Sequence, residues 1–262
     1  MRKLLTSLES EQLAKDISNW IKEYANNNSI KSLVVGISGG IDSSLVSTLC
    51  AMTGLPTYVL TMPIKQQKDQ HDLSLVHAKW LSSKFTNVEH QIIDLDNVYD
   101  MFNKTMKEFD NEHAFANSKS RLRMVTLYQV AGASNGIVVG TGNKIEDFGV
   151  GFYTKYGDGG VDISPIADLV KSEVYALSWA LGIERKIIDA PPTDGLWEDG
   201  RTDEDQMQGL TYGQLERAMD LVNLNAIPTG NDVKLIDTYS SIRKNNLHKM
   251  DDIPIFKMDK TQ

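Results

Sequence analysis

One segment carries the clearest structural signal in the chain: Leu33-Val34-Val35-Gly36-Ile37-Ser38-Gly39-Gly40-Ile41-Asp42-Ser43-Ser44. Its apolar run, Leu33–Ile37, predicts a strand buried on both faces, because polar residues do not alternate with the apolar ones. The Gly-Gly turn leads into a helix predicted over Ser43–Met52, which Gly54 and Pro56 end. A buried strand, a tight turn and a helix in this order are typical of a parallel α/β sheet.

The same alternation of short strands and amphipathic helices continues on both sides of this segment. A helix with apolar residues at helical spacing is predicted from about Leu8 to Tyr24. Further strands are predicted at Tyr58–Leu60, Gln91–Ile93 and Gly136–Gly140, and further helices at Leu73–Phe85, Val98–Phe109, Lys119–Ala133 and Leu169–Leu181, with two more after Gly209. We therefore expect a single domain over residues 1–262, an α/β, Rossmann-like, doubly wound parallel sheet flanked by helices on both faces. Ligands on such sheets bind beyond the carboxyl ends of the strands.

Composition and charge restrict the classes of partner. The chain has 262 residues, 41% of them hydrophobic, and a formal net charge of −8. This excludes a disordered chain, and the acidic excess argues against nucleic-acid or anionic-membrane partners, which need phosphate neutralisation. No apolar run approaches the ~20 residues of a membrane span, and polar residues after Leu5 end the apolar start too early for a signal peptide. Cys50 lies in an apolar helical stretch, so we expect a core residue and a cytoplasmic protein.

The glycine-rich turn has the chemistry of a phosphate-binding loop. Gly39 and Gly40 let the backbone approach a phosphate, and the following helix start offers unpaired N–H groups. Asp42 would repel a bare phosphate, so its presence favours a bridging Mg²⁺, which prefers one or two carboxylates with phosphate oxygens. The alternative is a tight strand-to-helix turn with a capping Ser or Asp. The string is neither a Walker loop nor GxGxxG.

Three later residues could complete such a site, although each has a simpler interpretation. Thr141 and Glu146 follow the strand at Gly136–Gly140 and leave the sheet on the same side. Glu146 could supply a second carboxylate for the metal, but a solvated glutamate in a first helical turn is the default. Lys171 stands among apolar residues, where a surface lysine with a packed stem is the default. The glycine- and tyrosine-rich run 152–162 suits a loop that contacts a ligand.

Taken together, these motifs resemble a known family. The SGGxDS loop is similar to that of the ATP pyrophosphatases, and the whole set resembles the ammonia-dependent NAD synthetases. The matching strings are SGGIDSS (38–44), GTGNKIE (140–146), FYTKYGDGG (152–160) with Asp162, the stretch Pro165–Lys171, Pro192-Thr193 and His248-Lys249. They occur in the family's order over nearly the whole chain, and residues 155–160 are the most specific part.

The resemblance implies a role for each matching position. ATP would contact Gly36, Ile37, Ser38, Gly39, Gly40, Ile41, Asp42 and Ser43, together with Thr141, Lys171 and Thr193. Mg²⁺ would be held by Asp42 and Glu146. Deamido-NAD would contact Arg121, Lys155, Asp162, His248 and Lys249, with Arg123 as the alternative to Arg121. A homodimer is also implied, and the N-terminal helix with Trp20 and Tyr24 could either supply its interface or pack on its own sheet.

Two departures from the family pattern leave the adenine contacts open. The family often has Asp-His after Gly-Thr, where this chain has Gly142-Asn143. An arginine that some members carry before the proline of the second strand is here Thr61 or Met62. Gln67 is a candidate polar contact nearby.

The implied reaction converts a carboxylate into an amide. ATP would adenylate the nicotinate carboxylate of deamido-NAD and release pyrophosphate, and ammonia would then expel AMP. Positioning and charge stabilisation would supply the rate, with Lys171 on the phosphates and Asp158 holding ammonium. A glutamine-dependent version needs an amidase domain with a catalytic cysteine, for which the chain has no room, so free ammonia is the expected donor. Alternatives are a GMP-forming or tRNA-thiolating ligase of the same superfamily, or a catalytically dead nucleotide-binding module.

The polar segment from Pro191 to Gly209 is long for a loop without structure in a compact domain. It is either a lid that orders over ATP or an acidic solvated loop. Trp197 favours the lid, because a large aromatic side chain usually packs against a partner.

Overall fold

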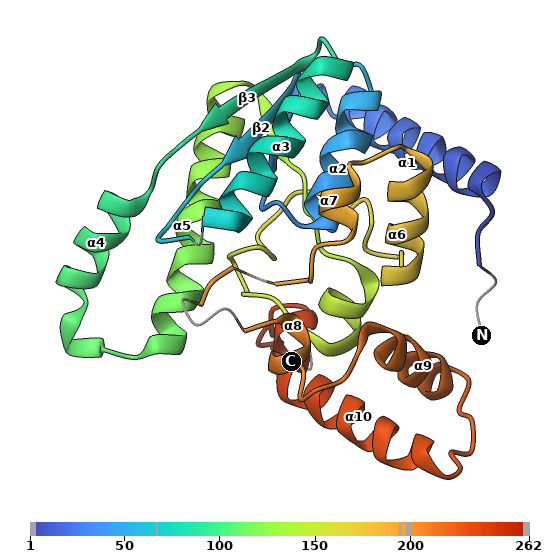
Figure 1. Ribbon diagram of the computed structural model, residues 1–262. Coiled ribbons are helices and arrows are strands. Elements are labelled where there is room, and N and C mark those ends of the chain that lie inside the picture. Colours follow the sequence, from blue (N-terminus) through green and yellow to red (C-terminus); the bar gives the residue numbers. More distant parts are fainter. Residues whose placement is uncertain (1–3, 67, 194, 198–200, 259–262) are drawn as a thin grey trace.

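A parallel sheet in the order β3-β2-β1-β4 forms the centre of the computed structural model, which describes residues 4–66, 68–193, 195–197 and 201–258 (Figure 1). The strands are β1 (Ser32–Gly36), β2 (Thr57–Thr61), β3 (Val88–Ile92) and β4 (Gly136–Val138). Val34 of β1 pairs with Tyr58 on one side and Val138 on the other. The strand order 3-2-1-4, with all pairs parallel, confirms the predicted doubly wound sheet.

Helices connect the strands and extend the chain beyond them. They are α1 (Ser7–Asn27), α2 (Ile41–Met52), α3 (Lys68–Lys84), α4 (Asp96–Thr105), α5 (Glu112–Ala133), α6 (Lys171–Ala180), α7 (Arg185–Ile188), α8 (Asp203–Gln206), α9 (Tyr212–Asn223) and α10 (Asn231–Met250). A 3₁₀ turn, η1, covers Lys107–Phe109, and a π-helical turn, η2, covers Lys144–Val150. In Figure 1, α8, α9 and α10 lie together below the sheet.

Side chains of β1 alternate between two apolar cores, one on each face of the sheet. Leu33 and Val35 pack in a cluster with residues of α1, α2, α3 and α6. Val34 points the other way, into a cluster with residues of α4 and α5. Because both faces are covered, the strand is apolar throughout, which explains the uninterrupted run in the sequence. Cys50 is buried in the first cluster, as predicted, and burial raises the pKa of its thiol.

Several element boundaries differ from the prediction for local reasons. Helix α5 begins at Glu112 instead of Lys119, because the Asn111 side chain accepts a hydrogen bond from Ala114 N at 2.9 Å and caps it. The strand predicted to reach Gly140 ends at Val138, and Val139 instead bridges Ile163. The helix predicted over Val98–Phe109 is divided into α4 and η1. The short helices α7 and α8 and the turn η2 were not predicted.

The N-terminal helix α1 packs on its own fold. Its buried residues Ala14 and Ile21 belong to the core cluster that contains residues of α2 and α6. Trp20 and Tyr24, whose rings lie 6.1 Å apart, remain 46% and 36% exposed. Within the described ranges, no helix is both long and apolar enough to cross a membrane.

Candidate active site

The turn between β1 and α2 presents an open helix start. Gly39 has a φ of 93°, a conformation that favours glycine. Helix α2 begins at Ile41, and its N-cap, Gly40, makes no side-chain capping bond. No Ser or Asp side chain therefore caps α2, although the Ser38 hydroxyl accepts a hydrogen bond from Gly40 N within the turn. The Ser43 hydroxyl donates to Gly40 O at 3.1 Å and lies 3.1 Å from the Ser38 hydroxyl. Backbone N–H groups and hydroxyls thus line a cradle suited to an anion.

A lysine joins two carboxylates beside this turn. The Lys171 ammonium donates to Asp42 Oδ2 at 2.5 Å and to Glu146 Oε1 at 2.9 Å. The lysine side chain is 3% exposed, and each carboxylate side chain is 16% exposed. The default interpretations of Lys171 as a surface lysine and of Glu146 as a solvated glutamate are therefore wrong.

Burial and mutual contact determine the charges in this group. Burial raises the pKa of Asp42 above its usual value, although the Lys171 charge opposes it. Burial acts the same way on Glu146, but the Lys171 charge and a hydrogen bond from the Tyr212 hydroxyl outweigh it, so that pKa lies below its usual value. Burial would lower the pKa of Lys171, but the two carboxylates raise it overall. The lysine is therefore held in its charged form.

Two residues that the sequence analysis missed fix this group in place. Asn143 donates from Nδ2 to Asp42 Oδ1 at 3.0 Å, and its Oδ1 accepts from the backbone N–H groups of Ile145 and Glu146. Asn143 thus caps η2 and links it to the phosphate-loop aspartate. Tyr212 donates to Glu146 Oε1 at 2.5 Å, and its ring lies 4.5 Å below the Lys171 ammonium.

The donor set fits Mg²⁺ held jointly with phosphates. Among the described residues, no group of three or more His, Cys, Asp or Glu could hold a metal ion. Mg²⁺, however, needs only one or two carboxylates when phosphate oxygens complete its coordination. The Lys171 ammonium already marks a cation position between Asp42 and Glu146.

The loop after η2 is fastened to α5. The Ser120 hydroxyl donates to Asp158 Oδ1 at 2.7 Å, and Thr154 N donates to the same oxygen at 3.0 Å. A Cβ at Gly157 would lie 2.3 Å from Ser120 Oγ, so only glycine allows this approach. Asp158 is nevertheless an exposed residue.

Four of the residues implied for deamido-NAD lie around this loop. The Arg121 side chain donates to Lys155 O at 3.3 Å, and the Lys155 ammonium donates to His248 O at 2.9 Å. The Lys249 ammonium donates to Gly151 O at 2.8 Å and to Tyr153 O at 2.9 Å. The structure thus brings Arg121, Lys155, His248 and Lys249 together from α5, the loop and the end of α10.

The remaining implied residues have structural partners. Asp162 Oδ2 accepts from Val138 N at 2.7 Å, and its Oδ1 accepts from the Tyr128 hydroxyl. Burial, with the Asp162 charge, raises the pKa of Tyr128 to about 12. The Thr193 hydroxyl donates to Arg201 O and accepts from Gly195 N. Thr141 lies half-buried just after the bridge at Val139.

The two candidate arginines on α5 differ in their surroundings. Arg123 donates from Nε to Met62 O at 3.0 Å and so ties α5 to the end of β2. Arg121 is exposed beside Lys155. The geometry favours Arg121 for the substrate contact. Gln67, the other candidate nearby, lies outside the described residues.

The described part of the late polar segment lies against α5. Trp197 stacks on His113 with ring centroids 6.0 Å apart, and its Nε1 donates to Gln206 Oε1 at 2.8 Å. The buried Lys119 donates to Leu196 O at 3.0 Å. These contacts favour a lid over a solvated loop, and its response to ATP stays a prediction.

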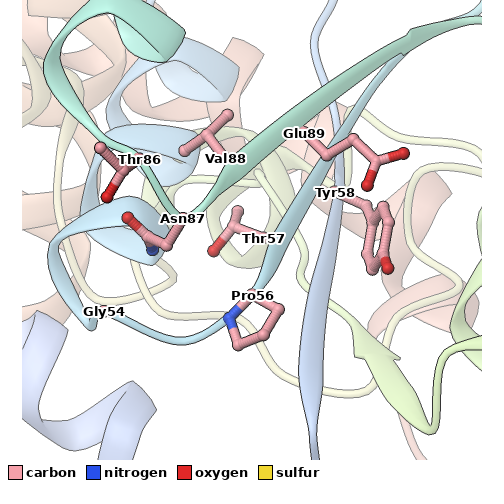
Figure 2. Close-up of a pocket in the computed structure, with 8 residues that line it drawn as sticks. All are labelled: Gly54, Pro56, Thr57, Tyr58, Thr86, Asn87, Val88 and Glu89. Atoms are coloured by element: carbon pink, nitrogen blue, oxygen red, sulfur yellow. The ribbon is translucent and has the colours of Figure 1, made fainter.

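A surface hollow elsewhere does not compete with this site. Figure 2 shows it at the start of β2 and β3, lined by residues such as Pro56, Tyr58 and Glu89. This is the end of the strands opposite to the phosphate loop, whereas ligands of such sheets bind at the carboxyl ends. The Asn87 amide at its centre donates to Ala51 O and Leu55 O, so it holds the surrounding turns together.

The fold and the site define a parallel α/β protein with a glycine-rich turn and two carboxylates joined by a lysine beyond the carboxyl ends of its strands. The NAD synthase family model matches residues 13–257. The NH(3)-dependent NAD(+) synthetase of Finegoldia magna is 40% identical over 207 residues, 78% of this chain and 82% of the relative. That of Carboxydothermus hydrogenoformans is 32% identical over 245 residues, 91% of this chain and 94% of the relative. The chain belongs to the NAD synthase family of ligases.

Solved structures of the family superpose on the same fold. The NMN synthetase of Francisella tularensis gives a TM-score of 0.85 at 31% identity, covering 95% of this chain and 99% of that one. The NH3-dependent NAD synthetase of Campylobacter jejuni gives 0.76 at 26% identity, with the same coverage of 95% and 99%.

Proposed function

We propose that the chain forms NAD from deamido-NAD, ammonia and ATP, releasing AMP and pyrophosphate. The observation that carries this proposal is the meeting of Asp42, Glu146 and Lys171 beside the open start of α2. That arrangement suits a nucleotide bound together with Mg²⁺. Membership of the NAD synthase family supports deamido-NAD as the acceptor. The enzyme acts on small molecules. A homodimer, a cytoplasmic location and a single domain over residues 1–262 are further parts of the proposal.

The first half-reaction joins the nicotinate carboxylate to the α-phosphate of ATP. The loop from Gly36 to Ser43 holds the phosphates through backbone N–H groups, with Thr141 and Thr193 as further contacts. Mg²⁺, when bound at Asp42 and Glu146, supplies charge neutralisation for the departing pyrophosphate. Lys171, once released from the carboxylates, adds a cation to the phosphates. The result is an adenylated carboxylate, which is a far better electrophile than the free carboxylate.

The second half-reaction replaces AMP with ammonia. Asp158 is exposed, and its Oδ1 accepts from the Ser120 hydroxyl and from Thr154 N, which fastens the loop to α5. In this proposal the same carboxylate would also hold ammonium next to the activated carbonyl. Transfer of a proton from ammonium to a carboxylate yields the nucleophile. Arg121, Lys155, Asp162, His248 and Lys249 hold the deamido-NAD. Because no step needs a protein nucleophile, positioning and charge placement supply the rate.

A second candidate differs only in the length of the acceptor. The Francisella tularensis structure, which covers nearly the whole of both chains with a TM-score of 0.85, is named an NMN synthetase. The same amidation on nicotinate mononucleotide would give NMN. Both substrates present the same pyridine carboxylate, so the adenylation machinery does not discriminate between them.

One assay separates these candidates. The protein is incubated with ATP, MgCl₂ and ammonium chloride, and with either deamido-NAD or nicotinate mononucleotide, and the amide and pyrophosphate are quantified. We expect NAD with the dinucleotide at a kcat/KM at least tenfold above that for the mononucleotide. The reverse ratio would establish the second candidate, and no amide with either acceptor would refute both.

A further inference from the structure

A tyrosine from the C-terminal part of the chain holds the carboxylate that the proposed function assigns to the metal. The Tyr212 hydroxyl donates to Glu146 Oε1 at 2.5 Å and lies 3.0 Å from Asp203 Oδ2. We infer that Tyr212 is a positioning residue for metal binding, which fixes the Glu146 carboxylate and couples it to the late segment through Asp203. This inference rests on the proposed function, because it takes Glu146 as a metal ligand.

Local structure leaves the tyrosine little freedom. Tyr212 is the first residue of α9, whose N-cap, Thr211, forms a capping box with Gln214. The Tyr212 residue is 8% exposed and packs in an apolar cluster with Met207 and Leu215. Packing therefore fixes the ring, and the position of the ring in turn fixes the hydroxyl against Glu146.

The hydroxyl is shared between two carboxylates. A phenol has one hydrogen to donate, and here Glu146 and Asp203 both lie within hydrogen-bond distance of it. Asp203 is the first residue of α8, within the late polar segment, and its N–H donates to Pro192 O at 3.2 Å. The Tyr212 hydroxyl therefore links Glu146 to Asp203 of the late polar segment.

The ring of Tyr212 contacts the cation that now occupies the metal position. The Lys171 ammonium lies 4.5 Å from the ring centroid while it bonds Glu146. The tyrosine thus contacts both members of the pair, the carboxylate through its hydroxyl and the ammonium through its face. Replacing the ammonium with Mg²⁺ removes one of the groups that orient Glu146. The Tyr212 hydroxyl then remains to keep the carboxylate oriented. Hydrogen bonds to ligating carboxylates typically contribute 10–100-fold to metal affinity.

The chain offers a matched control in the same cluster. Tyr239 is also buried, at 2% exposure, and belongs to the cluster that contains Tyr212. Its hydroxyl interacts with Arg243 and not with the carboxylates of the site. A general effect of losing a buried hydroxyl would therefore appear in Tyr239→Phe as well as in Tyr212→Phe.

The test measures metal binding without turnover. Mn²⁺ is titrated into each variant in the presence of α,β-methylene-ATP, and free Mn²⁺ is followed by electron paramagnetic resonance. We expect Tyr212→Phe to weaken Mn²⁺ binding about tenfold or more, and Tyr239→Phe to match the wild type. In the amidation assay, raised Mg²⁺ should restore the kcat of Tyr212→Phe. An unchanged or tighter Mn²⁺ affinity in Tyr212→Phe would overturn the inference.

A variant of the proposed metal ligand shows whether a negative result refutes the role of Tyr212 or the proposed metal site itself. Glu146→Gln should lose most Mn²⁺ binding, and a wild-type affinity in that variant would refute Glu146 as the metal ligand. Should Tyr212→Phe fail to fold, Thr211→Ala serves instead, because the capping residue is exposed and leaves the phenol intact. Loss of the cap should loosen the first turn of α9 and weaken Mn²⁺ binding up to about fivefold, the equivalent of a typical cap. No weakening in that variant would also count against the inference.

Discussion

Removing the Lys171 ammonium should destabilise the protein in a way that Mg²⁺ reverses. The ammonium lies 2.5 Å from Asp42 Oδ2 and 2.9 Å from Glu146 Oε1, and only 3% of its side chain is exposed. Lys171→Met keeps an unbranched side chain of similar length but leaves two buried carboxylates facing each other. Breaking a buried ion pair from one side costs about 3–5 kcal/mol. One carboxyl group can take up a proton, so we expect the lower end, about 3 kcal/mol.

The metal should substitute for the missing ammonium. A ligand at a hundred times its Kd stabilises the folded state by about 2.7 kcal/mol, if it does not bind the unfolded chain. In the wild type, Mg²⁺ must first displace Lys171, so part of its binding free energy is lost. In Lys171→Met the position is open. Mg²⁺ should therefore recover most of the lost stability in the variant and change the wild type far less.

Urea unfolding followed by circular dichroism, with and without MgCl₂, measures both effects. Lys144→Met is the matched control, since the ammonium of Lys144 pairs with Asp168, whose side chain is 93% exposed. An exposed pair contributes about 0–1 kcal/mol, so this variant should stay close to the wild type. The reasoning is refuted if Lys171→Met is as stable as Lys144→Met without metal. Equal stabilisation of variant and wild type by Mg²⁺ would refute the displacement argument.

Three further predictions follow from individual contacts. Burial lowers the pKa of His77 from 6.5 to about 4, so the unfolded chain takes up a proton first, and stability should fall by up to about 3 kcal/mol as pH drops through this window. A Cβ at Gly142 would lie 1.9 Å from Asp147 Oδ2, so Gly142→Ala should displace that side chain, next in the chain to Glu146, and lower stability by about 1–3 kcal/mol. Arg121→Ala should raise the KM for deamido-NAD at an unchanged melting temperature, whereas Arg123→Ala should lower the melting temperature.

Each of these predictions has its own check. Melting temperatures from about pH 4 to pH 8 should show a flatter profile for His77→Gln, and an identical slope would exclude His77 as the cause. Gly213→Ala provides the reference for Gly142→Ala, because nothing lies within 4 Å of the added Cβ on the exposed side of α9. A loss of equal size in both would contradict the steric argument. An unchanged KM in Arg121→Ala would remove that arginine from the substrate site.

The sequence predicted the sheet because its signal is local. The apolar run Leu33–Ile37, with the glycine pair shortly after it, defines β1 and the loop independently of the rest of the chain. Lys171 was harder, since its partners are 129 and 25 residues away in the chain. Its apolar neighbours fit either a surface lysine with a packed stem or a buried ion pair. Only the tertiary structure distinguishes these, because burial of the ammonium depends on where Asp42 and Glu146 arrive.

Asn143, Asp203 and Tyr212 were missed for different reasons. Asn143 did give a signal, since an asparagine after Gly-Thr-Gly is a good N-cap, but the sequence does not show that its amide also reaches Asp42. Asp203 lies in a helix of 4 residues within an acidic stretch, where nothing separates it from its neighbours. Tyr212 follows a turn at an ordinary helix start. A π-helical turn such as η2, which carries Glu146, is also too rare for sequence patterns to predict.

The acidic surroundings of the site imply an order of events. Burial raises the pKa of Asp147 well above its usual value, and the nearby charges of Asp158, Glu146 and Asp42 add to this. Such an environment repels a bare nucleotide, because its phosphates would meet carboxylates. Under the proposed function, a nucleotide that arrives with its metal would bring the positive charge that takes the place of the Lys171 ammonium. The released lysine would then follow the phosphates, so that the ammonium that now pairs with Asp42 and Glu146 would afterwards pair with the bound anion. The alternative order, metal first, would leave the displaced ammonium without an anion to bind, and this is why we expect Mn²⁺ affinity to rise when the ATP analogue is present.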